Sequence, residues 1–159
     1  MNIRVGFGFD VHQLKVGRPF FVGGVQIDHS KGADGHSDAD VLIHAICDAL
    51  LGAAAMGDIG QHFPNTDAQF KNIDSKILLK KVVQLLHSKR WQIGNIDATV
   101  VLEKPKIMKH AEAMRQTLAE VLDISDSQIS IKATTNETMG YVGREEGICA
   151  YAVCLIQQG

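Results

Sequence analysis

Cysteine is scarce in this sequence, with three residues in 159. Cys47, Cys149 and Cys154 are odd in number and contain no close pair, so they offer neither a disulfide framework nor the spacing of a zinc ribbon. Each lies in an apolar stretch, where cysteine usually packs as a small hydrophobic residue. We therefore expect structural cysteines and a reducing compartment.

An excess of charge of one sign is also lacking. The chain has 16 basic and 18 acidic residues and a formal net charge of −2. A general nucleic-acid binder would carry a basic surface, so we expect no nucleic-acid partner. A local anion site stays open, because a phosphate pocket needs only a few donors.

Long apolar runs are missing as well. The most apolar stretch, residues 41–56, is interrupted by His44 and Asp48 and is too short to span a bilayer. Residues 1–6 have neither the apolar segment of a signal peptide nor the arginine-rich character of a transit peptide. We expect no membrane partner and a soluble, cytoplasmic protein.

The familiar nucleotide motifs do not occur. There is no P-loop, and Gly6-Phe7-Gly8 lies inside a predicted strand, which excludes a Rossmann fingerprint. No serine or cysteine shows the pattern of an activated nucleophile. A nucleotide, if bound, must be held by another arrangement.

What is present predicts one domain over residues 1–159 with a real hydrophobic core, since 45% of the residues are hydrophobic and no repeat or linker interrupts them. Alternating apolar residues predict strands at residues 3–9, 20–27, 94–103, 128–134 and 148–156. Helical periodicity predicts helices at residues 37–57, 74–90 and 107–123. The fold class is therefore α+β, with helices layered on one mixed β-sheet.

Three local features refine this fold. Gly23-Gly24 predicts a bulge or a close backbone approach within the second strand. Ser37, with Asp40 three positions later, predicts the start of the first helix as in a capping box. A polar loop follows that helix up to about residue 72. In the second helix the pattern predicts five buried side chains, Ile77, Leu78, Val82, Leu85 and Leu86.

Asp10 and His12 are the first candidate site. Residues i and i+2 of a strand project to the same side, so the pair is either a polar strand end or two metal ligands. His44 has Asp40 and Asp48 at i−4 and i+4, which indicates a solvated helical stripe, a histidine at the edge of the core held by an acidic neighbour, or a ligand whose other ring nitrogen meets an aspartate. Together, Asp10, His12 and His44 would leave one tetrahedral position open, as catalytic zinc sites do.

Polar residues at three other places fit phosphate and sugar binding. His36 precedes the first helix, and Asp58-Ile59-Gly60 follows it, either as turn chemistry or as donors and acceptors for a substrate. The run 134–137 follows a strand and is either an ordinary loop or a phosphate-holding one, with Glu137 on a second cation. Lys104, Lys106 and Lys109 around Pro105 form a solvated face or a nucleotide site.

The ordered motifs resemble the 2-C-methyl-D-erythritol 2,4-cyclodiphosphate synthase family from end to end. The matching stretches, numbered by residue, are GFDVH (8–12), HSDADV (36–41), HA (44–45), DALLGAA (48–54), GDIG (57–60), FPNTD (63–67), KATTNE (132–137) and GREEGI (143–148). Several independent motifs in the same order make this resemblance specific.

The resemblance implies a metal-dependent enzyme. Asp10, His12 and His44 would hold Zn²⁺ (or Mn²⁺), and a Mg²⁺ or Mn²⁺ ion with Glu137 would bridge the diphosphate of the substrate. His36 and Thr135 match positions that stabilise charge in the transition state. The implied substrate-binding residues are Asp10, His12, His36, Ser37, Asp58, Ile59, Gly60, Phe63, Pro64, Asn65, Thr66, Asp67, Pro105, Lys106, Ile107, Met108, Thr134, Thr135, Asn136, Glu137, Tyr141 and Arg144.

The implied reaction is that of a phosphorus-oxygen lyase. The 2-phosphate of 4-diphosphocytidyl-2-C-methyl-D-erythritol 2-phosphate attacks the β-phosphorus and CMP leaves, within the non-mevalonate pathway of isoprenoid biosynthesis. The resemblance also implies a homotrimer with active sites between subunits and an axial cavity for an isoprenoid diphosphate near Phe9, Tyr141 and Arg144. Two positions depart from the family: Asn65 replaces a usual Asp, and Tyr141 a usual Phe.

Two other functions fit the same residues. A zinc hydrolase would need a general base near the metal, for which Asp38 and Asp40 are the nearby acids. A trimeric binding protein would sense isoprenoid diphosphate through the axial cavity. Product analysis separates the cyclase from the hydrolase, and ligand binding that survives replacement of His12 and His44 would favour the sensor.

Overall fold

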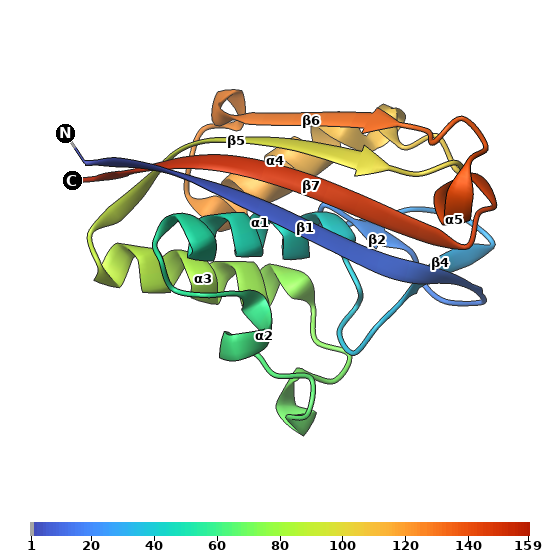
Figure 1. The fold of residues 1–159 in the computed structure, drawn as a ribbon, viewed down its shortest axis with the longest axis horizontal. Coiled ribbons are helices and arrows are strands. Elements are labelled where there is room, and N and C mark those ends of the chain that lie inside the picture. Colours follow the sequence, from blue (N-terminus) through green and yellow to red (C-terminus); the bar gives the residue numbers. More distant parts are fainter. Residues whose placement is uncertain (1) are drawn as a thin grey trace.

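Five strands form one mixed sheet in the computed structural model, which describes residues 2–159 (Figure 1). They are β1 (Ile3–Val16), β4 (Lys31–Asp34), β5 (Trp91–Val101), β6 (Ile129–Thr134) and β7 (Gly147–Gln158). Their order is β4-β1-β7-β5-β6, and only the β5–β6 pair is parallel. A separate hairpin pairs β2 (Phe21–Val22) with β3 (Val25–Gln26).

The long helices lie on one face of this sheet (Figure 1). They are α1 (Val41–Ala53), α3 (Ser75–Ser88) and α4 (Ala111–Leu122). The short helical segments are α2 (Ile59–His62), α5 (Gly140–Gly143), η1 (Ala68–Phe70), η2 (Met108–His110) and η3 (Asp126–Gln128). The predicted α+β class, with helices layered on one mixed sheet, is confirmed.

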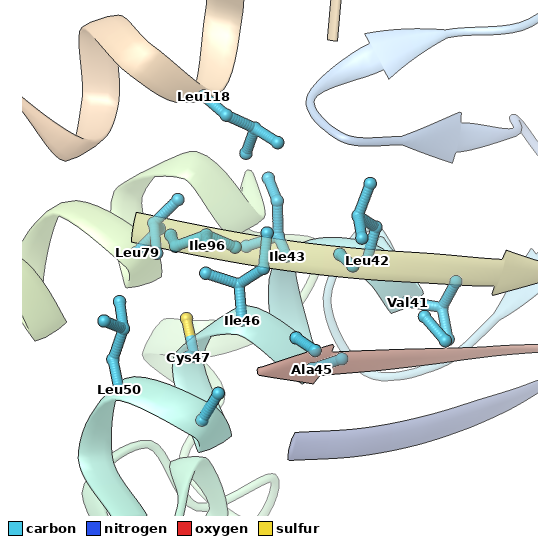
Figure 2. Packing of buried hydrophobic residues seen from close by; sticks show 14 of the residues in the cluster. Val41, Leu42, Ile43, Ala45, Ile46, Cys47, Leu50, Leu79, Ile96 and Leu118 are labelled. Atoms are coloured by element: carbon cyan, nitrogen blue, oxygen red, sulfur yellow. The ribbon is translucent and has the colours of Figure 1, made fainter. Parts of the chain in front are cut away.

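The core lies around α1, which is buried on almost every side. Figure 2 shows Ile43 and Ile46 of α1 gathered with Leu79 of α3, Ile96 of β5 and Leu118 of α4 in one apolar cluster. A helix that is hydrophobic all round must be central, because no face of it can be given to water. Each large side chain that is fully buried contributes roughly 1.5–3 kcal/mol.

Two glycines let α1 lie directly on β1. A Cβ atom at Gly6 would come within 1.9 Å of the Ala49 carbonyl oxygen, and one at Gly8 would come equally close to that of Ala45. Any side chain at these positions would push the helix away from the strand. This contact holds the first turn of α1 beside residues 10–12 of β1.

Most predicted elements are confirmed in type, although their ends differ, most of all in β1, which continues past residue 9 to Val16. Residues 3–9, 94–103, 128–134 and 148–156 lie in β1, β5, β6 and β7, and the helices predicted at residues 74–90 and 107–123 are α3 and η2–α4. Asp74 caps α3 by accepting a hydrogen bond from the Lys76 amide. All three cysteines are free and buried, as expected.

The prediction of one continuous strand at residues 20–27 is wrong. The segment folds back on itself as the β2–β3 hairpin, and Gly23 and Gly24 form its turn with φ of +60° and +76°. Two successive positive φ angles are what tight hairpin turns require, and glycine adopts them without a steric cost. The pair of glycines therefore reverses the chain and does not form a bulge.

Two further expectations need correction. Asp40, not Ser37, caps α1, because its carboxylate accepts the Ile43 amide. Ile77 is 48% exposed, since it lies in the first turn of α3 on the solvent side of the helix. The patterns also predicted neither β4 nor α5, which are too short for their periodicity to stand out. No helix in residues 2–159 is both long and apolar enough to cross a membrane.

Candidate metal centre and substrate pocket

Asp10, His12 and His44 converge into one cluster, called here the metal cluster. Asp10 Oδ2 lies 2.8 Å from His12 Nε2 and 3.1 Å from His44 Nδ1, and the two imidazole nitrogens lie 3.1 Å apart. β1 supplies the first two residues on its helix-facing side, and the first turn of α1 supplies the third. The sequence prediction that these three residues meet is confirmed.

The dimensions of the metal cluster suit a small divalent ion. Ligands placed about 2.0–2.1 Å from a tetrahedral zinc ion lie about 3.3 Å from one another, close to the separations observed. One carboxylate and two imidazoles are ligand types that zinc and related divalent ions accept. The cluster can therefore hold a metal ion with a position left for another ligand.

The negative charge of Asp10 favours the binding of a metal ion in the cluster. Burial raises the pKa of Asp10, but hydrogen bonds from His12 and His44 and their charge outweigh it and lower that pKa to about 2. Burial lowers the pKa of His44, but the hydrogen bond and charge of Asp10 raise it above the usual value. Asp10 thus stays ionised at neutral pH, and a metal ion entering the cluster competes with protons on His44.

The outer nitrogen of each imidazole has its own acceptor. His12 Nδ1 lies 3.1 Å from the Asp34 carbonyl oxygen, to which it donates, so Nε2 is free for a metal. His44 Nε2 lies 3.0 Å from Ser75 Oγ and 3.1 Å from Ser37 Oγ. In the neutral rings these partners fix the tautomer in which the nitrogens facing the cluster are unprotonated, whereas the hydrogen bonds to Asp10 belong to the protonated, metal-free rings.

The expectation that Asp40 or Asp48 meets the outer ring nitrogen of His44 is wrong. Asp40 is fully buried and accepts the amides of Gly23, Gly24 and Ile43, so it joins α1 to the β2–β3 turn. Asp48 accepts the Ile59 amide at 2.7 Å and holds the start of α2. Both carboxylates are engaged by backbone amides, whereas serine hydroxyls take the place beside His44.

A cavity of about 320 Å³ opens beside the metal cluster. Its lining contains seven predicted substrate residues in addition to His12 and His44 of the cluster: His36, Ser37, Ile59, Gly60, Phe63, Pro64 and Asn65. Phe70 and Leu78 complete an apolar wall; the sequence patterns predicted only that Leu78 is buried and did not single out Phe70. The His36 ring donates from Nε2 to the Asp67 carbonyl at 3.1 Å, which ties it to the loop before η1. One polar end and one apolar wall suit a ligand with a phosphate and a carbon skeleton.

Three predicted residues lie on the adjoining loops and do not line this cavity. Asp58 caps α2 by accepting the Gln61 amide, and Asp67 caps η1 by accepting the Gln69 amide. Thr66 is exposed between them. Asp58 therefore serves in local turn chemistry, one of the two interpretations left open from the sequence.

A second group of predicted residues gathers where β5 and β6 end. Pro105, Lys106, Ile107, Met108, Thr134 and Thr135 line a separate cavity of about 100 Å³, together with Leu102 and Ala133. Strand register places Val11, Cys149, Val101 and Thr134 side by side across the sheet. Three strand spacings of about 4.8 Å therefore separate this cavity from the metal cluster by about 14 Å.

The remaining predicted residues do not join the metal cluster within one chain. Glu137 is exposed and accepts a hydrogen bond from Thr135 Oγ1 at 3.4 Å, while Asn136 donates its amide to Glu103. Arg144 is exposed and paired with Glu146 at 3.0 Å, and Tyr141 is exposed on α5. One chain thus holds two separate groups of predicted site residues, called here the half-sites, one at β1–α1 and one at the β5–β6 end.

Sequence reasoning missed two residues that support the cluster, Asp34 and Ser75, and considered Asp38 only as a possible general base. Asp34 acts through its backbone carbonyl, which no side-chain pattern reveals. Ser75 lies 31 residues beyond His44 and at the first position of α3, where serine is usually interpreted as a helix-start residue. No local signal in the sequence connects Ser75 with His44 or with Asp38.

Known proteins match the chain across its length. The YgbB family matches residues 3–157. The 2-C-methyl-D-erythritol 2,4-cyclodiphosphate synthase of Cytophaga hutchinsonii is 62% identical over 156 residues, covering 98% of each chain. Among solved structures, the bifunctional IspDF from Campylobacter jejuni is 40% identical with a TM-score of 0.96, covering 99% of this chain and 43% of that one.

The solved structure of IspF from Plasmodium falciparum, in a CDP complex, is 34% identical with a TM-score of 0.88 and covers 99% of this chain and 97% of that one. A matching family profile, relatives of about 60% identity and near-identical folds agree with the motifs of the metal cluster and its cavity. This chain therefore belongs to the YgbB family, together with the 2-C-methyl-D-erythritol 2,4-cyclodiphosphate synthases that it matches over nearly its full length.

Proposed function

We propose that this chain converts 4-diphosphocytidyl-2-C-methyl-D-erythritol 2-phosphate to 2-C-methyl-D-erythritol 2,4-cyclodiphosphate with release of CMP, a step in the non-mevalonate route to isoprenoid precursors. The observation that carries the proposal is the metal cluster opening on a cavity lined by the family motifs. Three free, buried cysteines agree with a reducing, cytoplasmic setting.

The reaction needs charge neutralisation and alignment more than covalent chemistry. One phosphate of the substrate attacks another, so two anionic groups must approach closely. Asp10, His12 and His44 would hold Zn²⁺ or Mn²⁺, which supplies positive charge to phosphate oxygens when bound. A second ion, Mg²⁺ or Mn²⁺, would be held with the help of Glu137.

Protein side chains supply the remaining interactions. His36, held by the Asp67 carbonyl, and Thr135 would donate hydrogen bonds to phosphate oxygens as charge shifts in the transition state. Lys106 would add charge near the diphosphate. The cavity beside the metal cluster would align the attacking phosphate, which lowers the entropic cost of ring closure.

Two binding regions would divide the substrate between them. Loops at residues 58–60 and 63–67 would hold the methylerythritol portion, with Phe70 and Leu78 against its carbons. Residues 105–108, together with residues 134–136, would hold the cytidine through backbone groups. The CDP complex of the relative from Plasmodium falciparum agrees with a cytidine nucleotide as ligand.

We also propose that three copies assemble, with each active site between neighbours. The two half-sites lie about 14 Å apart in one chain, so a half-site from a second chain would complete each active site. Supporting this, β1 and β7 expose a row of apolar side chains on the face without helices, called here the open face: Ile3, Val5, Phe7, Phe9, Val11, Tyr151 and Val153. Large exposed apolar patches usually mark association surfaces.

The most detailed part of this proposal is that an isoprenoid diphosphate binds in an axial cavity of the trimer. Phe9 lies on the open face with its ring 5.1 Å from that of Tyr151. Tyr141 adds a hydroxyl that a phenylalanine would lack, and Arg144 would have to exchange Glu146 for a phosphate. A binding protein without catalysis would share these residues, so the experiment below must measure turnover.

The hydrolase alternative loses its general base. Asp40 is fully buried and bonded to three amides, and Asp38 accepts hydrogen bonds from Ser75 and from the Asp40 amide. Neither carboxylate lines the cavity beside the metal cluster. A water molecule at the cluster would therefore lack the proton acceptor that a zinc hydrolase uses.

Phosphorus NMR tests the proposal directly. The metal-replete protein is incubated with the diphosphocytidyl substrate, and CMP and a cyclic diphosphate should form together and fail to form with His44→Ala. CMP with a linear bisphosphate would establish a hydrolase and refute the cyclase. Metal binding without any turnover would favour the ligand-sensing trimer.

A further inference from the structure

His44 is the one metal-cluster residue whose outer nitrogen meets side chains alone. Its Nε2 lies 3.0 Å from Ser75 Oγ, and the Ser75 hydroxyl in turn donates to Asp38 Oδ1. Ser75 is fully buried at the start of α3, and Ser37 beside it is nearly so. A chain of hydrogen bonds therefore runs from the cluster through α3 to the segment before α1.

Asp38 determines which atom donates and which accepts in each of these hydrogen bonds. Its Oδ2 accepts the Ser75 amide at 3.0 Å and its Oδ1 accepts the Asp40 amide at 3.2 Å, so both oxygens face donors. The Ser75 hydroxyl has one proton and must give it to Asp38. Its oxygen is then left to accept from His44, which requires the proton of the neutral ring to sit on Nε2.

That proton position decides how His44 meets the cluster. With hydrogen on Nε2, the lone pair of Nδ1 points toward Asp10 Oδ2 and His12 Nε2. The reversed tautomer would direct an N–H into the cluster and block a metal ion. Outer hydrogen bonds of this type set the tautomer and orientation of ligating histidines.

Ser37 cannot set this direction alone. Its Oγ lies 3.1 Å from His44 Nε2 and accepts the Ala39 amide, but it donates to no carboxylate in the described residues. A hydroxyl without such an anchor can turn and donate to the imidazole instead. Ser75, whose hydroxyl donates to Asp38, therefore determines that the proton of His44 lies on Nε2. Ser37 supplies a second, weaker contact to the same nitrogen.

We infer that Ser75 and Asp38 are positioning residues that hold His44 in its metal-binding tautomer. The inference rests on the metal binding that the proposed function assigns to the cluster. It predicts that Ser75→Ala weakens zinc binding about 10-fold, with Ser37 compensating in part, and that Ser37→Ala/Ser75→Ala weakens it about 100-fold, spanning the usual range for such partners.

Zinc competition with a chelator measures these affinities on the full chain. Ser88→Ala is the matched control, because Ser88 is a serine near the other end of α3 whose hydroxyl donates only to the Leu85 carbonyl. Its zinc affinity should equal that of the unaltered chain. Asp38→Asn should weaken zinc binding as Ser75→Ala does, and the double variant Asp38→Asn/Ser75→Ala should lose little more, since both act through one chain of hydrogen bonds.

Unfolding of the metal-free variants in urea separates positioning from folding. A merely structural Ser75 would lower the stability of the metal-free protein and leave zinc affinity within two-fold of the unaltered chain, which would overturn the inference. An affinity loss in Ser75→Ala equal to that in Ser88→Ala would do the same. If the unaltered chain takes up no zinc, the metal centre itself fails and this inference with it.

Discussion

The two sides of β1 differ in almost every respect. Toward the helices the strand presents Gly6, Gly8, Asp10 and His12, whereas the open face presents Phe7 and its apolar neighbours, with Phe7 62% exposed. Glycine on the helix side lets α1 approach the strand, and this approach brings His44 to Asp10 and His12. The apolar side makes no contact with the helices and is left for another surface.

This comparison teaches how a strand can serve packing and chemistry at once. The alternation of side chains gives one strand two independent faces. A strand with apolar side chains toward the helices would hold α1 at the ordinary distance and His44 too far from Asp10. The chain instead uses its smallest residues where the helix rests and its polar residues where the helix begins.

The largest effect should come from the polar end of the helix side. Asp10→Ala removes one of three ligands and the only negative charge of the cluster. We expect metal retention and turnover to be lost together, measured by metal content after gel filtration and by phosphorus NMR. Full turnover without bound metal would contradict the assignment of the cluster.

Gly8→Ala should have the next largest effect, because it destabilises the folded protein. The added Cβ would meet the Ala45 carbonyl oxygen at 1.9 Å, so α1 must shift, and we expect a loss of about 3 kcal/mol in the free energy of unfolding. Gly52→Ala is the control, since its Cβ would meet only the Phe7 carbonyl oxygen at 4.0 Å. That change should be neutral or stabilising by up to about 1 kcal/mol, because alanine favours the helix. Equal destabilisation in urea would refute the close-contact argument.

A smaller effect should follow from the charge of Asp10. Its pKa is about 2 in the folded metal-free chain and 3.8 ordinarily, so the ionised carboxylate adds about 2 kcal/mol of stability above pH 4. A depressed carboxyl pKa means that this contribution is lost as the pH falls toward 2. In urea unfolding with chelator present, stability should decline more steeply from pH 4 to pH 2 in the unaltered chain than in Asp10→Asn. Parallel declines would contradict the low pKa.

The smallest effect on the single chain should come from the open face. Phe7→Glu replaces an exposed side chain, so the stability of one chain should change by less than about 0.5 kcal/mol. Assembly, however, should be lost, with mass falling from three chains to one in light scattering. Turnover should fall with assembly, while zinc binding persists because the cluster lies within one chain. A trimer that survives the change would locate the association surface elsewhere.

The sequence patterns predicted long elements well and short ones poorly. Strand periodicity over β1 and β7 and helical periodicity over α3 and α4 extend for many residues, so their type was clear. The β2–β3 hairpin has two residues in each strand, too few for a period, and its two glycines fit a bulge as well as a turn. Ile77 matched an apolar stripe that the actual rotation of α3 turns toward solvent.

The metal cluster could be predicted because its residues are of types that bind metal ions and because their spacing and positions are informative. Asp10 and His12 share a strand face by spacing alone, and His44 lies near a helix start. Their meeting with each other, and the partnership of His44 with Ser75, depended on how α1 and α3 pack. A serine 31 residues away carries no local signal of its contact with an imidazole.

Sequence by itself determined the long elements, most of their apolar positions and the chemical inventory, because these follow from side chains a few positions apart. Tertiary structure alone decided which face of β1 meets α1 and which hydroxyls direct His44. It also decided that the two half-sites stand apart in one chain. These outcomes arise from contacts between residues distant in sequence, where packing and hydrogen-bond geometry choose among partners that are chemically alike.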